Sequence, residues 1–147
     1  MSRAVGFYEE FLALPGVWVP GVAHSGSIRD FTRSTGPSDE RHIVGYLRYG
    51  VSLWSLPEPA PDVLDPLGPV LPGAGSLRTD GDWIWRADLA HYVEKYHLML
   101  PVDFLSLVRS RAFVVPRVPS EQLRAILTTE LGIRLDPWLD DGSNKDL

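Results

Sequence analysis

The pattern of hydrophobic and polar positions changes its period within one short stretch of the chain, residues 78–96. The first part alternates as a β-strand does, and the second part repeats every three to four residues as a helix does. Between two extended segments stands the pair Asp80-Gly81, a usual centre of a two-residue hairpin turn. We therefore expect residues 76–79 to pair with residues 82–85 in an antiparallel hairpin.

Two tryptophans dominate the second strand of this hairpin. Because side chains alternate across a sheet, Trp83 and Trp85 should share one face, whereas Ile84 should point to the other. We interpret both tryptophan rings as parts of the hydrophobic core, since large aromatic side chains gain most from burial.

A helix is predicted directly after the hairpin. Its apolar positions recur at helical spacing and form one stripe, with a polar face opposite. The stripe consists of Leu89, Tyr92, Val93 and Tyr96. The opposite face carries Asp88, His91, Glu94 and Lys95. We expect this second face to be exposed to solvent.

Further helices are expected on both sides of this stretch. Residues 3–13 carry apolar side chains among acidic ones, as a short amphipathic helix does. Residues 39–49 follow a serine that suits an N-cap, and Gly50 is expected to end that helix in a left-handed conformation. Two more helices are predicted to begin near Pro101 and Pro119.

Two further strands are expected over residues 51–56 and residues 113–115, where β-branched and aromatic residues gather. The stretch between them from residue 57 to residue 75 is rich in proline and glycine, and we interpret it as a connector. Its apolar residues are expected to anchor it to the core, namely Val63, Leu64, Val70 and Leu71. Four or five helices with a few short strands predict an α+β domain with a small, mainly antiparallel sheet that includes the 76–85 hairpin.

Length and composition fit one globular domain over residues 1–147. Hydrophobic residues make up 44% of the chain, which is sufficient for a packed core. Residues 20–37 are rich in glycine, serine, threonine and proline, so they are predicted to form a mobile loop. The acidic C-terminal tail is expected to fray from about residue 142.

Charge and composition also narrow the classes of partner. The formal net charge of −5 is spread along the chain, so the protein is not expected to bind nucleic acid or membranes. A basic protein is the favoured class of partner. No apolar run reaches the roughly 20 residues that span a bilayer, and the N-terminus lacks the apolar segment of a secretion signal. The absence of cysteine excludes disulfides and thiolate metal sites. We expect a cytoplasmic protein.

Candidate catalytic chemistry centres on two of the four histidines. His24 stands beside serines, and His91 lies one helical turn from Asp88 and Glu94. Neither pattern completes a nucleophile elbow or a metal site, and the glycines match no nucleotide-binding loop, so no cofactor or metal is expected. A small hydrolase or metal-dependent enzyme that uses His24 or His91 with nearby carboxylates stays open as an alternative.

Trp138 is the tryptophan that we interpret as a contact for another protein. It stands in the acidic tail, and tryptophan is frequent in interfaces because it buries a large area at low entropic cost. Asp136, Asp140 and Asp141 surround it and would form a charged rim. We therefore expect a non-enzymatic protein-binding module, with a structural or oligomerising domain as a further alternative.

Residues 78–104 resemble a segment shared by small, uncharacterised bacterial proteins, many of them from actinobacteria. The shared positions are Asp80-Gly81, Trp83, Trp85, Asp88-Leu89, Tyr92, Tyr96, Leu100-Pro101 and Phe104. Relatives often have proline where this chain has Arg86, which should weaken the start of the helix here. The resemblance implies no catalytic residues. In size, acidity and lack of catalytic motifs, such proteins are similar to the immunity partners of polymorphic toxins, so sequestration of a partner is the implied function.

Overall fold

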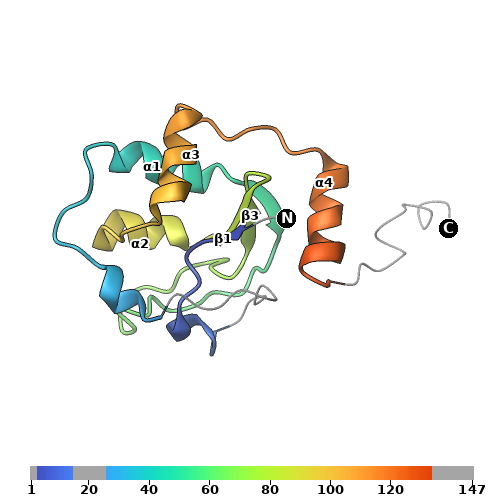
Figure 1. Cartoon of the computed structure of the whole chain (residues 1–147). Coiled ribbons are helices and arrows are strands. Elements are labelled where there is room, and N and C mark those ends of the chain that lie inside the picture. Colours follow the sequence, from blue (N-terminus) through green and yellow to red (C-terminus); the bar gives the residue numbers. More distant parts are fainter. Residues whose placement is uncertain (1–2, 15–25, 134–147) are drawn as a thin grey trace.

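A four-stranded sheet with the strand order β1-β4-β3-β2 is the centre of the fold (Figure 1). The computed structural model describes residues 3–14 and 26–133. Its strands are β1 (Arg3–Ala4), β2 (Val51–Trp54), β3 (Leu77–Thr79) and β4 (Trp83–Arg86). Strand β3 pairs antiparallel with both β2 and β4, whereas β1 runs parallel to β4.

Helices cover both faces of this sheet. The α-helices are α1 (Glu40–Arg48), α2 (Leu89–Tyr96), α3 (Val102–Ser110) and α4 (Ser120–Ala125). Helix α4 continues into a π-helical turn, η3 (Ile126–Glu130), and two 3₁₀ turns are η1 (Glu9–Phe11) and η2 (Ile28–Phe31). The predicted α+β domain with a small, mainly antiparallel sheet is confirmed. Among the described helices, none has the length and apolar character needed to cross a bilayer.

The two faces of β4 belong to separate hydrophobic clusters. Trp83 and Trp85 pack edge-on against Phe104 of α3, with ring centroids 5.2 Å and 5.8 Å away. Ile84 points to the opposite face and packs in the cluster that includes Ile126 of η3. In Figure 1, α1, α2 and α3 accordingly lie together on one side of the sheet, and α4 lies on the other. The predicted placement of the two tryptophans is confirmed.

The hairpin forms where the sequence predicted it, but its turn lies one residue later. The N–H of Asp80 donates to the carbonyl of Trp83 at 3.3 Å, so Gly81 and Asp82 are the loop residues. The observed pairs are Leu77–Arg86, Arg78–Trp85 and Thr79–Ile84. The predicted partners are therefore wrong by two positions, an even shift that keeps every side chain on its expected face.

The side chain of Asp80 explains this turn. Its Oδ1 accepts the N–H of Asp82 at 2.9 Å and the N–H of Trp83 at 2.7 Å. Gly81 then occupies the first loop position with a φ of +96°, the left-handed conformation that a type II′ turn requires there. The carboxylate thus selects which two residues form the loop.

The helix predicted over residues 3–13 is wrong. This stretch contains β1 and the short turn η1, because its backbone pairs with β4: the N–H of Val5 donates to the carbonyl of Ile84 at 3.0 Å. A φ of +79° at Gly6 then redirects the chain, and a Cβ at this glycine would lie 2.7 Å from Cδ1 of Leu89. The apolar positions of residues 3–13 are compatible with a helix or a strand. Pairing with the edge of β4 selects the strand for Arg3 and Ala4.

The strand predicted over residues 113–115 is also wrong. Ala112 and Phe113 have φ angles of 51° and 62°, which no strand residue adopts. The Phe113 ring lies 5.2 Å from the His42 ring, so its apolar surface is used in packing and not in a sheet. The strand over residues 51–56 is confirmed as β2, which ends at Trp54.

Gly50 ends α1 for a different reason from the one predicted. It is not among the positive-φ residues, and Tyr49 before it has a φ of −93°. A Cβ at Gly50 would instead lie 2.4 Å from Cζ2 of the buried Trp85. Glycine is required here for space.

Gly50→Ala should therefore lower the free energy of unfolding by about 1–3 kcal/mol, because a methyl group is forced against the Trp85 ring. The matched control is Gly45→Ala in the middle of α1, where no atom lies within 4 Å of the added Cβ. The control should raise stability by about 0.5–1 kcal/mol through helix propensity. Urea denaturation measures both changes, and equal stabilities for the two variants would contradict this role of Gly50.

Candidate functional site

A buried carboxylate, Asp62, joins the connector of residues 57–75 to helix α2. Its side chain is only 3% exposed. Its Oδ2 accepts the hydroxyl of Tyr96 at 2.8 Å and lies 2.7 Å from Nε2 of His91. Its Oδ1 accepts the N–H of Leu64 at 2.8 Å. The carboxylate is thus held by its own loop and by two side chains of α2.

These bonds set the ionisation of Asp62. Burial alone would raise the pKa of this carboxyl, but the hydrogen bonds from His91, Tyr96 and the N–H of Leu64 outweigh it and lower the pKa below its ordinary value. Asp62 is therefore ionised at neutral pH, and the buried charge depends on these donors.

The prediction of a solvent-exposed polar face on α2 is wrong for His91. No local pattern indicates the partner of His91, because Asp62 lies 29 positions earlier in the proline-rich connector. Glu94 and Lys95 of the same face are exposed, as predicted. Glu94 pairs with Arg48 at 2.9 Å, and Lys95 pairs with Asp65 at 3.5 Å. Only part of the face is exposed.

The same prediction is wrong for Asp88, which is buried against Arg86. The guanidinium Nε and Nη2 each donate to one carboxylate oxygen at 3.1 Å. Burial raises the pKa of Asp88 above its ordinary value, and the attraction of Arg86 opposes that rise. The guanidinium also lies 4.5 Å from the centre of the Phe11 ring. Arg86 thus pairs with the residue directly before α2, and the weakening of the helix start expected from the sequence stays a prediction.

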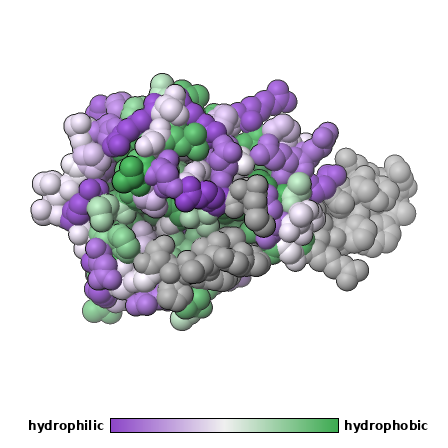
Figure 2. Space-filling model, in the orientation of Figure 1, coloured by the Kyte–Doolittle hydropathy of each residue, from purple (hydrophilic) through white to green (hydrophobic). Residues whose placement is uncertain are grey.

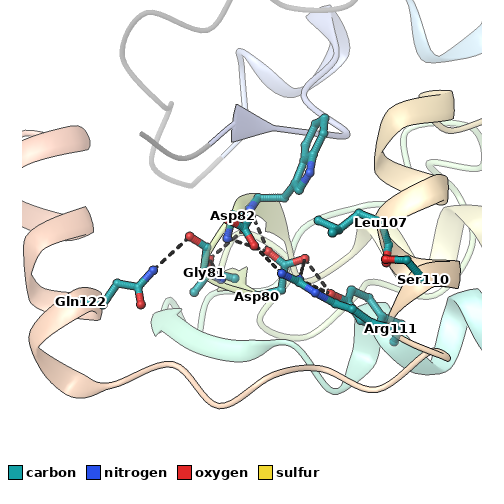
Figure 3. A network of polar contacts seen from close by, with 10 residues as sticks. Asp80, Gly81, Asp82, Leu107, Ser110, Arg111 and Gln122 are labelled. Atoms are coloured by element: carbon teal, nitrogen blue, oxygen red, sulfur yellow. Dashed lines mark hydrogen bonds and ion pairs between the residues drawn. The ribbon is translucent and has the colours of Figure 1, made fainter.

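A second polar network fastens the hairpin turn to three helices (Figure 3). Oδ2 of Asp80 accepts the hydroxyl of Tyr46 at 2.7 Å and lies 3.1 Å from Nη1 of Arg111. Arg111 also pairs with Asp82, and Gln122 of α4 donates to the carbonyl of Gly81 at 3.1 Å. Since both oxygens of Asp80 are occupied by donors, this network positions the hairpin and offers no free base.

The described histidines and carboxylates do not assemble a metal centre. Within residues 3–14 and 26–133, no three side chains of the types His, Asp and Glu lie together in a way that could hold a metal ion. His97 is engaged through Nδ1 with Glu40 at 2.8 Å, and the two described pockets are lined by residues other than His91 and Asp62. The other candidate, His24, lies outside the described residues.

The connector of residues 57–75 is a structured loop with an apolar tip. Ala60 and Leu71 exchange two backbone hydrogen bonds at its base, of 3.1 Å and 2.7 Å. Consecutive turns follow, closed by the N–H of Asp65 on the carbonyl of Asp62 at 3.0 Å and by the N–H of Gly68 on the carbonyl of Asp65 at 2.9 Å. Leu67 lies within the second turn and is 98% exposed.

The anchors of this loop are partly those predicted. Val63, Leu64 and Leu71 pack against the core, and the N–H of Val63 donates to the hydroxyl of Tyr92 at 2.9 Å. Val70 was expected to anchor the loop as well, but its side chain is 57% exposed. On the face shown in Figure 2, hydrophobic residues lie between hydrophilic ones. Among the large hydrophobic side chains of the described residues, Leu67 has the highest exposed fraction, followed by Tyr49 at 81% and Val102 at 80%.

The partner-binding residues predicted in the tail, Asp136, Trp138, Asp140 and Asp141, lie outside the described residues, as does the tail from residue 142. The first part of the predicted mobile loop, residues 20–25, does so too. Its described part includes the buried Ile28, whose N–H donates to Glu10 at 2.9 Å. The mobility of the loop and the tail surface stay predictions.

Comparison with protein-family models, with curated proteins and with solved structures finds no match to this chain. The resemblance of residues 78–104 to a bacterial family therefore stays a prediction.

His91→Ala should lower the free energy of unfolding by about 1–3 kcal/mol, because it leaves the buried Asp62 without one of its hydrogen-bond donors. Glu94→Ala on the same helix removes only a solvent-exposed ion pair and should cost less than about 0.5 kcal/mol. Chemical denaturation compares the two. An equally small effect of both substitutions would restore the interpretation of His91 as a solvated residue.

The contribution of Asp62 should also depend on pH. Because its folded-state pKa lies below the ordinary value, its stabilisation is complete above about pH 4 and is lost as the pH falls through the folded-state pKa. The stability difference between the wild type and Asp62→Asn should thus shrink as the pH decreases below about 4. Denaturation curves at a series of pH values measure it, and a difference that grows on acidification would contradict the assignment.

Proposed function

We propose that this chain is a cytoplasmic protein-binding module whose binding surface includes the loop of residues 57–75. The observation that carries the proposal is Leu67, an apolar side chain that is 98% exposed on a turn whose base is fixed to α2. Burying such a side chain in a partner contributes about 1.5–3 kcal/mol, so Leu67 fits the role of an interface anchor.

The rigidity of the loop supports this role. Binding is weakened when a loop has to be ordered at the interface. Here the base of the loop is already fixed by the Ala60–Leu71 pairing and by the bonds that Asp62 receives from α2. The loop would present Leu67 to a partner at little further entropic cost.

The partner that fits this surface is a protein with an apolar socket and a basic rim. Glu58 in this loop is exposed, and the chain carries a net charge of −5. Asp65 next to the tip is 48% exposed, and its charge is shared with Lys95 at 3.5 Å. Opposite charge on the partner would speed association and favour the correct partner. An immunity-type role, in which such a partner is sequestered, belongs to this proposal and is supported by the resemblance described above.

The test is an affinity capture from the native host with wild-type and variant baits, followed by measurement of the affinity for the captured protein. Leu67→Asp should weaken binding at least about tenfold, because it places a charge where the partner is apolar. The matched control is Val114→Asp in the α3–α4 connector, which changes an equally apolar, 66% exposed residue and should bind as the wild type does.

Two results would overturn the proposal. Equal affinity of Leu67→Asp and the wild type would place the binding surface elsewhere on the molecule. Turnover of a small molecule by the purified protein, without capture of any protein, would favour the hydrolase alternative. Circular dichroism of each variant ensures that a loss of binding is not a loss of folding.

A further inference from the structure

The outer edge of β1 offers backbone groups for pairing. The N–H of Arg3 donates to the carbonyl of Asp82 at 2.8 Å, and that of Val5 donates to the carbonyl of Ile84 at 3.0 Å. Since hydrogen-bonding directions alternate along a strand, Ala4 between them turns its N–H and C=O away from β4. In the part of the chain that the structure describes, β1 has no strand on this side.

An apolar pocket of 260 Å³ lies beside this edge. It is lined by Ala4 of β1 and the residues after it, by Phe31 of η2, by Met99 in the segment between α2 and α3, and by Val102 of α3. None of the residues that line the pocket carries a formal charge. The pocket therefore suits a neutral, apolar group.

The rim of the pocket exposes large apolar side chains. Val102, the first residue of α3, is 80% exposed, and Met99 is 45% exposed. Arg3 and Asp103, which are adjacent in sequence to the pocket residues Ala4 and Val102, form an ion pair with one another. A ligand at this position thus meets apolar surface and a charge-neutral border.

The outer edge of β1 and the adjoining pocket together form a groove. We propose that this groove binds an extended apolar segment of another protein. The segment adds a short strand beside β1, its backbone pairs with the N–H and C=O of Ala4, and one aliphatic side chain occupies the pocket. Strand addition of this kind derives affinity from the backbone and specificity from pockets for alternate side chains. The inference goes beyond the proposed function, since the groove and the loop of residues 57–75 share no residue.

The volume and the edge together favour a peptide over a small molecule. Sites for drug-sized ligands usually have about 300–1,000 Å³, so a pocket of 260 Å³ fits a single side chain better. The outward N–H and C=O of Ala4 can pair with the backbone of an extended peptide.

The methionine content of the chain allows a site-specific test. There are two methionines, Met1 and Met99, so labelling of methionine methyl groups gives one signal from the rim of the pocket. The probe is a short blocked peptide of alternating valine and threonine. Saturable shifts of the Met99 methyl and of the Ala4 amide during titration are the expected result.

Three comparisons identify the mode of binding. A peptide with N-methylated backbone amides should bind at least about tenfold more weakly, because it cannot pair with Ala4. Val102→Asp should cause a similar loss; an acidic residue at the start of α3 is favourable to the helix, so the variant should fold. Val114→Asp and Leu67→Asp change exposed residues outside the groove and should leave peptide binding unchanged.

The proposal fails if the Met99 signal does not respond to the peptide, or if N-methylation leaves the affinity unaltered. It also fails if the Met99 signal depends on protein concentration alone and light scattering gives a dimer mass, because a second copy then occupies the groove. Loss of peptide binding in Leu67→Asp would assign the peptide to the loop and exclude the groove.

Discussion

The buried carboxylate of Asp80 is the interaction on which the arrangement of the fold depends. It accepts two backbone N–H groups of its own turn and thereby selects the hairpin loop. It also accepts Tyr46 from α1 and pairs with Arg111 at the end of α3. A buried charge is tolerated only when donors surround it, so the turn, the two helices and the register of β3 with β4 have to form together.

Asp62 is a second buried carboxylate held by donors, and it fixes the loop of residues 57–75 to α2. By binding His91 and Tyr96, it converts a stretch rich in proline and glycine into a loop with fixed turns. The imidazole that the sequence offered as a catalytic candidate is a structural donor in this arrangement. What the loop presents to solvent is the side chain of Leu67. The proposed binding surface depends on this arrangement, because the bonds of Asp62 fix the base of the loop that carries Leu67.

Features with local causes were predictable from the sequence, and features with distant partners were not. The hairpin, the two faces of β4 and helix α2 follow from turn residues and from the spacing of apolar positions over a few residues. The role of Gly50 depends on a tryptophan 35 positions later, and the pairing of β1 depends on β4. For the candidate site, the sequence predicted only a connector over residues 57–75 and did not single out Leu67. The fixed turn of this loop depends on Asp62, and no periodicity indicates the contact of Asp62 with α2.

The parallel pairing of β1 with β4 joins the start of the chain to a strand beyond its middle. During synthesis β1 therefore leaves the ribosome long before β4, its neighbour in the described sheet, has been made. Contacts between such distant positions slow folding, because a long segment must be closed before they form. We therefore expect the N-terminal strand to join the sheet last, because a nascent chain that ends before residue 83 lacks the β4 edge with which β1 pairs.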